Sequence, residues 1–237
     1  MEGFTYTNIF ETKGIEYLVI IAFFAIMVPF WLLLSRKTKV SLSVSKASRL
    51  ITINSIRIPQ GVFFSKFHTW AHLDVNGDAK VGIDDLLLHI TGSVSIENTK
   101  TPGEIINKGD LLTTISHNGK ILRVLSPVSG EIRAANAEIA DNPDLVKDDP
   151  YRQLWIYTIK PTNWKAETST YYLADEATIW MLKELARFKD FLAAAVAKYI
   201  PEPSGRLVLQ DGGELLEQPL AEFPEEIWDE FQQEFLS

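Results

Sequence analysis

The sequence predicts an α+β protein with three parts: one N-terminal transmembrane helix, then a mostly β barrel or sandwich, then a C-terminal helical extension. Three patterns indicate this arrangement. Tyr17–Leu34 contains no charged residue, and short strand-like runs separated by Gly and Pro turns fill residues 61–164. Apolar residues recur at three- and four-residue spacing over Tyr172–Tyr199. We place the predicted segments at residues 1–16, 17–35, 36–60, 61–164, 165–200 and 201–237.

The apolar run Tyr17–Leu34 is interpreted as a transmembrane helix. At ~1.5 Å per residue it extends roughly 27 Å, which is close to the thickness of a hydrocarbon core. A buried helix of a globular core is an alternative, but such helices are rarely apolar on every face. A cleaved signal peptide is the other alternative. It would start with basic residues and end at small ones, whereas Ser35-Arg-Lys-Thr-Lys39 follows this run.

Charges on the two sides of this run predict its orientation. Residues 1–16 contain three glutamates and one lysine, whereas residues 36–60 contain six basic residues and no acidic one. Because loops rich in Lys and Arg stay on the cytoplasmic side, we expect a single-pass protein of the cytoplasmic (inner) membrane. Residues 1–16 would lie outside, and a basic linker would connect the helix to a cytoplasmic domain.

Ser116–Gly130 predicts two short strands joined by a tight turn at Asn118-Gly119. Asn-Gly is favoured in two-residue type I′ turns because both central residues need a positive φ. The stretch Ser126-Pro-Val-Ser-Gly130 predicts a further change of chain direction. This hairpin is the most strongly specified local structure in the sequence.

Several motifs in Gly61–Trp164, which is less than half of the chain, resemble the glycine cleavage system H protein. They follow the order of that family and include Phe67-His-Thr-Trp70, Val81-Gly-Ile-Asp-Asp85, Gly109-Asp110, the hairpin, and Ser126-Pro-Val-Ser-Gly-Glu131. The resemblance implies a lipoyl-type hybrid barrel. It also implies that, in the family, lipoic acid is attached to a lysine at the hairpin tip.

The hairpin tip departs from the pattern that the resemblance implies. The family lysine stands eight residues before the proline of Ser-Pro-Val-Ser-Gly, and Gly119 occupies that position here. Lys120 follows directly, and a one-residue offset in a strand reverses the face to which a side chain points. The main hypothesis is therefore a domain without the lipoyl lysine, for which no cofactor is expected. The alternative is lipoate on Lys120.

The other elements of the central domain are predicted from turns and caps. Asp84 is a candidate N-cap for a short helix that ends at Thr91, and Asn76-Gly77 predicts a second hairpin. A helical turn is expected over Asn142–Lys147. Strands are expected over Phe63–Trp70, Ala71–Val75, Ser93–Glu97, Leu111–Ser116, Lys120–Ser126, Gly130–Asn136 and Leu154–Lys160.

The C-terminal extension begins with the long helix Tyr172–Tyr199, for which Asp175 is a candidate cap. A small hairpin over residues 206–216 and a last helix over Pro224–Leu236 follow. The last helix has an apolar stripe, which is formed in part by Trp228, Phe231 and Phe235. This stripe either packs on the chain's own domain or docks in a groove of a partner protein, so these three residues are candidate partner-binding residues.

Composition excludes several classes of function. The chain has no cysteine, which excludes disulfides, thiolate metal sites and a cysteine nucleophile. Its net charge of −8 argues against a nucleic-acid partner. The sequence contains no Ser/His/Asp arrangement, phosphate loop or dinucleotide fingerprint. We therefore predict no catalytic residue and a protein that is not an enzyme.

The histidines and acidic residues also fail to form a recognisable metal site. His68 and His72 have the spacing of two ligands on a helix, but this segment is predicted as strand. Residues 74–85 resemble a calcium loop in which Ala79 and Asp85 replace the required glycine and glutamate. His117 is interpreted as an exposed histidine of the turn. No metal is therefore expected.

The main functional hypothesis is a membrane-anchored, non-catalytic scaffold or accessory subunit for a cytoplasmic or membrane enzyme complex. Its partners would be the membrane and other proteins, for example in a redox or respiratory complex. The alternative is a lipoyl carrier of the glycine cleavage type, which shuttles an aminomethyl or other group on Lys120. A third hypothesis, an activity or assembly role of the appended helices, has no residue constellation to support it.

Overall fold

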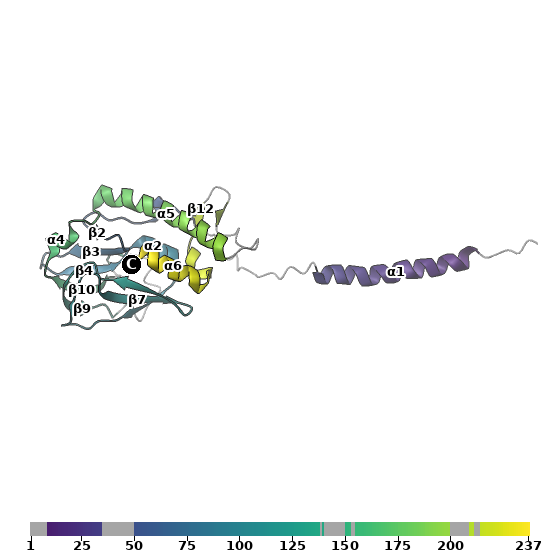
Figure 1. Ribbon diagram of the computed structural model, residues 1–237, viewed down its shortest axis with the longest axis horizontal. Helices are drawn as coiled ribbons and strands as arrows, with labels where there is room; N and C mark the ends of the chain where they lie inside the picture. The colour runs from purple at the N-terminus through teal and green to yellow at the C-terminus, as the bar shows by residue number, and fades with distance from the viewer. Residues whose placement is uncertain are drawn as a thin grey trace, which may run out of the picture. The chain divides into compact units, whose positions relative to one another are not determined.

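The computed structural model describes residues 9–34, 50–137, 139, 150–152, 155–199, 209–210 and 214–237 (Figure 1). The chain divides into two units, Met1–Ala47 and Ser48–Ser237. The helical turn expected over Asn142–Lys147 lies outside the described residues.

The described part of the first unit is the helix α1 (Ile9–Leu34). Among the described residues, no helix is both long enough and apolar enough to span a bilayer. The predictions of a transmembrane helix, of the membrane as a single-span partner and of an inner-membrane location are therefore wrong.

A six-stranded antiparallel sheet is the largest sheet of the second unit. Its spatial order is β2 (Phe63–Phe64), β3 (Thr69–Leu73), β4 (Ala79–Ile83), β10 (Trp155–Pro161), β9 (Gly130–Ala135) and β6 (Ile105–Ile106). Residues 65–68 lie outside the strands, so the strand expected over Phe63–Trp70 is interrupted. The interruption coincides with the positive φ of His68, 58°, which is incompatible with strand geometry.

A second antiparallel sheet consists of β5 (Ser95–Asn98), β7 (Leu111–His117) and β8 (Lys120–Leu125). Along β8, Leu122 and Val124 are buried, whereas Ile121 and Arg123 are exposed, as the two-residue period of a strand requires. The buried side chains of both sheets belong to one hydrophobic core. The predicted mostly β domain is therefore confirmed.

Two helices follow the predicted signals closely. Asp84 caps α2 (Asp85–Thr91), because its carboxylate accepts the Leu87 N–H at 2.8 Å. After the short α4 (Trp164–Thr168), the long helix is α5 (Ala174–Tyr199). It begins one residue before Asp175, which therefore lies in the first turn and is not the cap.

The C-terminal residues fold within the second unit. Strand β1 (Leu50–Ile51) pairs with β12 (Glu214–Leu216), which pairs with β11 (Leu209–Gln210). The short 3₁₀ helix η4 (Pro219–Glu222) and the helix α6 (Glu225–Phe235) follow. Figure 1 shows α6, in yellow, beside α5 and the sheet that contains β7.

The apolar stripe of α6 lies inside the chain's own core. Trp228, Phe231 and Phe235 are all fully buried. The rings of Phe231 and Phe235 pack against Phe188 and Phe191 of α5, with ring centres 5.4–6.0 Å apart. Of the two interpretations of this stripe, internal packing is the arrangement that the structure contains.

Candidate functional site

The tip of the β7–β8 hairpin has the geometry that its sequence predicts. Asn118 and Gly119 have φ values of 49° and 83°, which are the two positive values of a type I′ turn. His117 and Lys120 form the pair that closes the hairpin. Lys120 is therefore the first strand residue after the turn, and Gly119 lies within the turn.

The amine of Lys120 is bound by the C-terminal residues of the same chain. Its Nζ donates to the carbonyl oxygens of Ala221 and Phe223, each at 2.8 Å. It also lies 5.0 Å from the centre of the Trp228 ring, within the range of a cation–π contact. Burial lowers the pKa of Lys120, and the carboxylate of Glu222 acts in the opposite direction.

Further contacts hold η4 and α6 against the hairpin. The side-chain amide of Gln232 spans the backbone of Arg123: the Arg123 N–H donates to Gln232 Oε1 at 2.6 Å, and Gln232 Nε2 donates to the Arg123 carbonyl at 3.2 Å. The indole N–H of Trp228 donates to the Leu220 carbonyl at 2.8 Å, which joins η4 to α6.

His117 connects the hairpin tip to α6. Its ring stacks on Trp228, with ring centres 6.2 Å apart and planes 9° from parallel. Its Nδ1 donates to the Ser93 carbonyl at 2.7 Å, and its Nε2 lies 3.1 Å from the side-chain amide nitrogen of Asn118. His117 is therefore packed and hydrogen-bonded, not a free histidine of an exposed turn.

His68 forms a separate, buried ionic network. Its Nδ1 lies 2.8 Å from Asp84 Oδ2, and its Nε2 lies 3.7 Å from Glu184 Oε2. Burial by itself would lower the pKa of His68, but the two carboxylates more than offset this and raise it to about 9. Glu184 in turn accepts two hydrogen bonds from Arg187, at 2.8 and 3.1 Å. These residues form a structural charge network between the β domain and α5.

The two histidines at metal-ligand spacing do not converge. His72 bonds the Gly61 carbonyl through Nδ1 at 3.0 Å, whereas His68 faces the two carboxylates described above. Among the described residues, no three His, Cys, Asp or Glu side chains gather around a common point. In the calcium-like segment, Asn76 Oδ1 accepts the Asp78 N–H at 3.0 Å, an ordinary turn contact.

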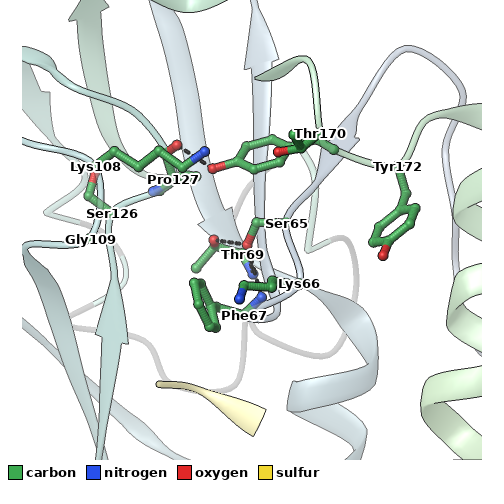
Figure 2. Close-up of a pocket in the computed structure, with 11 residues that line it drawn as sticks. Ser65, Lys66, Phe67, Thr69, Lys108, Gly109, Ser126, Pro127, Thr170 and Tyr172 are labelled. Atoms are coloured by element: carbon green, nitrogen blue, oxygen red, sulfur yellow. Dashed lines mark hydrogen bonds between the residues drawn. The ribbon is translucent and has the colours of Figure 1, made fainter. Parts of the chain in front are cut away.

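A cavity of about 260 Å³ lies at the opposite end of the hairpin, and its lining includes Gly109 and Ser126, which flank β7 and β8 (Figure 2). The hydroxyls of Ser65 and Thr69 lie 2.7 Å apart and bond to each other. Lys108 Nζ donates to the Glu167 carbonyl at 2.8 Å. The cavity lining does not include the hairpin turn, where the resemblance places the attachment lysine, so the hairpin tip is the stronger candidate site.

Sequence reasoning identified Lys120 and the stripe residue Trp228, but it did not predict that the two residues are in contact. The groups that bind the Lys120 amine are main-chain carbonyls, which every residue possesses. No residue pattern therefore marks them. The only relevant signal is the amphipathic pattern of α6, which predicts that the helix packs on something without saying where.

Comparisons with known proteins match the central part of the chain. The family model described as "Glycine cleavage H-protein" matches residues 62–184. Similar relatives include a "Probable glycine cleavage system H protein" of Pyrococcus furiosus, 32% identical over 118 residues, which are 50% of this chain and 87% of that protein. "Glycine cleavage system H protein 2" of Pseudomonas putida is 33% identical over 106 residues, 45% of this chain and 83% of that one.

Among solved structures, a glycine cleavage system H protein from Mycobacterium marinum is similar, with 23% identity and a TM-score of 0.41. The match covers 44% of this chain and 87% of that one. The matched residues of the family model end within α5, so η4 and α6 lie outside that match.

Proposed function

We propose, from the premise that this chain belongs to the glycine cleavage H-protein family, that its β domain is a lipoyl carrier with Lys120 as the attachment residue. The observation that carries this proposal is the position of Lys120. It directly follows the type I′ turn and is the single lysine between Leu111 and Leu125. As in the glycine cleavage reaction that the family name describes, the carrier would move an aminomethyl or other group between partner enzymes.

The hairpin fits the attachment of lipoate because its turn holds the lysine in a defined position. Asn118 and Gly119 form the type I′ turn, and Lys120 is the first strand residue after it. The amine would attack an activated lipoyl carboxyl, form an amide bond, and release the leaving group and one proton. When attached, lipoate supplies a disulfide that can be reduced and can accept the transferred group.

A second candidate is a non-catalytic accessory subunit that never carries lipoate. Two observations favour it: Gly119 stands where the resemblance places the modified lysine, and the Lys120 amine is already bound to Ala221 and Phe223. In this case the domain would dock on a larger enzyme through an H-protein-like surface. Neither candidate requires the chain itself to catalyse a reaction.

The mass of the protein purified from its own host distinguishes the two candidates. Trypsin cleaves after Lys108, Lys120 and Arg123, but not after an acylated lysine. A carrier therefore yields an uncut peptide from Gly109 to Arg123 that includes the lipoyl mass, and a Lys120→Arg variant loses this adduct. Unmodified Lys120 in an extract in which the host's other H proteins are fully lipoylated would contradict the carrier function and support the accessory subunit.

A further inference from the structure

The ammonium group of Lys120 has three acceptors, all contributed by the C-terminal residues. They are the carbonyl oxygens of Ala221 and Phe223 and the face of the Trp228 ring. A lysine ammonium has three N–H donors and accepts no hydrogen bond, so these three groups match its full capacity. The free amine and the segment that surrounds it therefore stabilise each other.

We propose that residues 218–228, which we name the cover segment, dock on the free amine of Lys120 and are displaced when that amine is acylated. This inference rests on the function proposed above, because acylation is the step that makes Lys120 a carrier residue. The hairpin would then have a closed form with a free lysine and an open form with an acylated one.

Acylation removes the contacts that hold the cover segment in place. An amide has one N–H, so at least one of the carbonyls of Ala221 and Phe223 loses its donor. A buried carbonyl without a partner is unfavourable. The charge that attracts the amine to Trp228 is lost as well. The acyl carbon would also need space beside Nζ, where two carbonyl oxygens now lie at 2.8 Å.

The displacement would be confined to the cover segment. Phe231 and Phe235 anchor the rest of α6 in the aromatic cluster with α5, and these contacts do not involve Lys120. At the other end, Gln218 has a φ of 62°, an uncommon conformation for a residue with a side chain. Its N–H is held by the His89 carbonyl at 2.8 Å. The cover segment can therefore move between Gln218, whose backbone is strained, and the aromatic cluster that holds the rest of α6 in place.

The coupling acts in both directions. If docking of the cover segment disfavours acylation of Lys120, acylation must disfavour docking by the same factor at equilibrium. A partner protein that binds the open hairpin would thus promote acylation, and an acylated hairpin would expose Trp228 to that partner.

Competitive chemical acetylation of the full-length protein tests the first half of the proposal. With a limiting amount of an N-hydroxysuccinimide acetate, we expect Lys120 to react about tenfold more slowly than the exposed Lys160, because two hydrogen bonds must break first. Trp228→Ala should reduce this difference to about twofold or less, because it removes the aromatic acceptor and also the indole N–H that joins η4, which contains Ala221, to α6. Equal rates in the wild-type protein, or no effect of Trp228→Ala, would overturn the proposal.

If Trp228→Ala does not fold, a less disruptive variant, Gln232→Ala, and its control, Gln233→Ala, test the same point. Gln232→Ala removes the two hydrogen bonds to the Arg123 backbone, so it should accelerate acetylation of Lys120 measurably. Gln233 is exposed, and Gln233→Ala should leave the rate unchanged. Identical rates in these two variants would contradict a cover that is attached through α6.

Hydrogen exchange tests the second half of the proposal. Lys120→Gln imitates the neutral acylated residue, whereas Lys120→Arg keeps the charge and the donors. We expect the amides of residues 221–223 and 225–227 to exchange about fivefold faster or more in Lys120→Gln and within about twofold of the wild type in Lys120→Arg. Unchanged exchange in Lys120→Gln would overturn the proposal.

Different results would contradict the carrier function and the cover segment. Absence of lipoate from the host protein contradicts the carrier function. Rapid acetylation of Lys120 in unmodified protein contradicts the cover segment, even where lipoate is found in the host.

Discussion

Gly119 and Asn118 at the hairpin tip both have left-handed backbone conformations. Glycine adopts this region without steric cost, and Asn tolerates it better than most residues. A Cβ at Gly119 would meet no atom within 4 Å. A substitution at this position therefore acts through backbone conformation alone.

Gly119→Ala should destabilise the protein by about 1 kcal/mol, because alanine is strained at this φ. Gly119→Asn should cost less, because Asn is the side chain best suited to this region. Urea unfolding of the two variants and the wild type measures the difference. Equal stability of the Ala and Asn variants would show that the turn relaxes to another type.

His68 illustrates a residue whose charge depends on tertiary structure. It lies in a buried position between Asp84 and Glu184, and these carboxylates favour its protonated form. Because the pKa is higher in the folded state than in the unfolded state, protonated His68 stabilises the fold.

The free energy of unfolding should therefore fall as pH rises from about 6.5, the unfolded pKa, to about 9, the folded pKa. Below pH 6.5 the contribution of His68 is fully present. Denaturation in urea at a series of pH values measures this decline, and NMR titration of the His68 ring gives its pKa directly. A ring that titrates near 6.5 in the folded protein would contradict the network described.

At the scale of elements, α6 is held by its aromatic residues and not by its many acidic ones. Phe231 is fully buried and stacks on Phe235 with ring centres 4.8 Å apart. The exposed face, by contrast, contributes ion pairs such as Arg187 with Glu234, which stabilise little in water.

Phe231→Ala should destabilise the protein by about 3–5 kcal/mol, because it removes a buried ring and leaves a cavity. Gln233→Ala, on the exposed face of the same helix, should change stability by about 0.5 kcal/mol or less. Chemical denaturation of both variants compares them. A small effect of Phe231→Ala would mean that α6 is detached in solution.

The pairing of β9 with β10 depends on a glycine for a different reason. A Cβ at Gly130 would lie 2.2 Å from the Lys160 carbonyl oxygen. This steric clash could be relieved only if the backbones of the two strands moved apart. Gly130→Ala should therefore cost about 1–3 kcal/mol, more than Gly119→Ala. Urea unfolding of the Gly130→Ala and Gly119→Ala variants compares the two losses of stability. A larger loss in Gly119→Ala would contradict the close approach of β9 and β10.

At the scale of the whole molecule, segments far apart in sequence share one core. Ile51 of β1 pairs with Leu215 of β12, and both are buried in the cluster that includes the inner faces of the large sheets. The C-terminal residues are therefore part of the second unit's structure and not an appended tail.

The anchored part of α6 should consequently unfold together with the β domain. We expect the amides of residues 231–235 to exchange with a free energy within about 1 kcal/mol of those in β7 and β8 under native conditions. Hydrogen exchange at increasing urea measures both sets. A much lower value for α6 would show that the C-terminal helix opens as an independent unit.

The sequence alone determined the local features: the type I′ turn at Asn118-Gly119, the Asp84 cap, most strands and the long helix α5. Their causes lie within a few residues, in backbone sterics, capping and hydrophobic periodicity. The same reasoning failed for the apolar run of α1, since no helix in the described part of the chain is long and apolar enough to span a bilayer. Only the tertiary structure showed that Ala221 and Phe223 bind the amine of Lys120, about a hundred residues away. Main-chain carbonyls have no sequence signature, and their partners depend on how the whole chain packs.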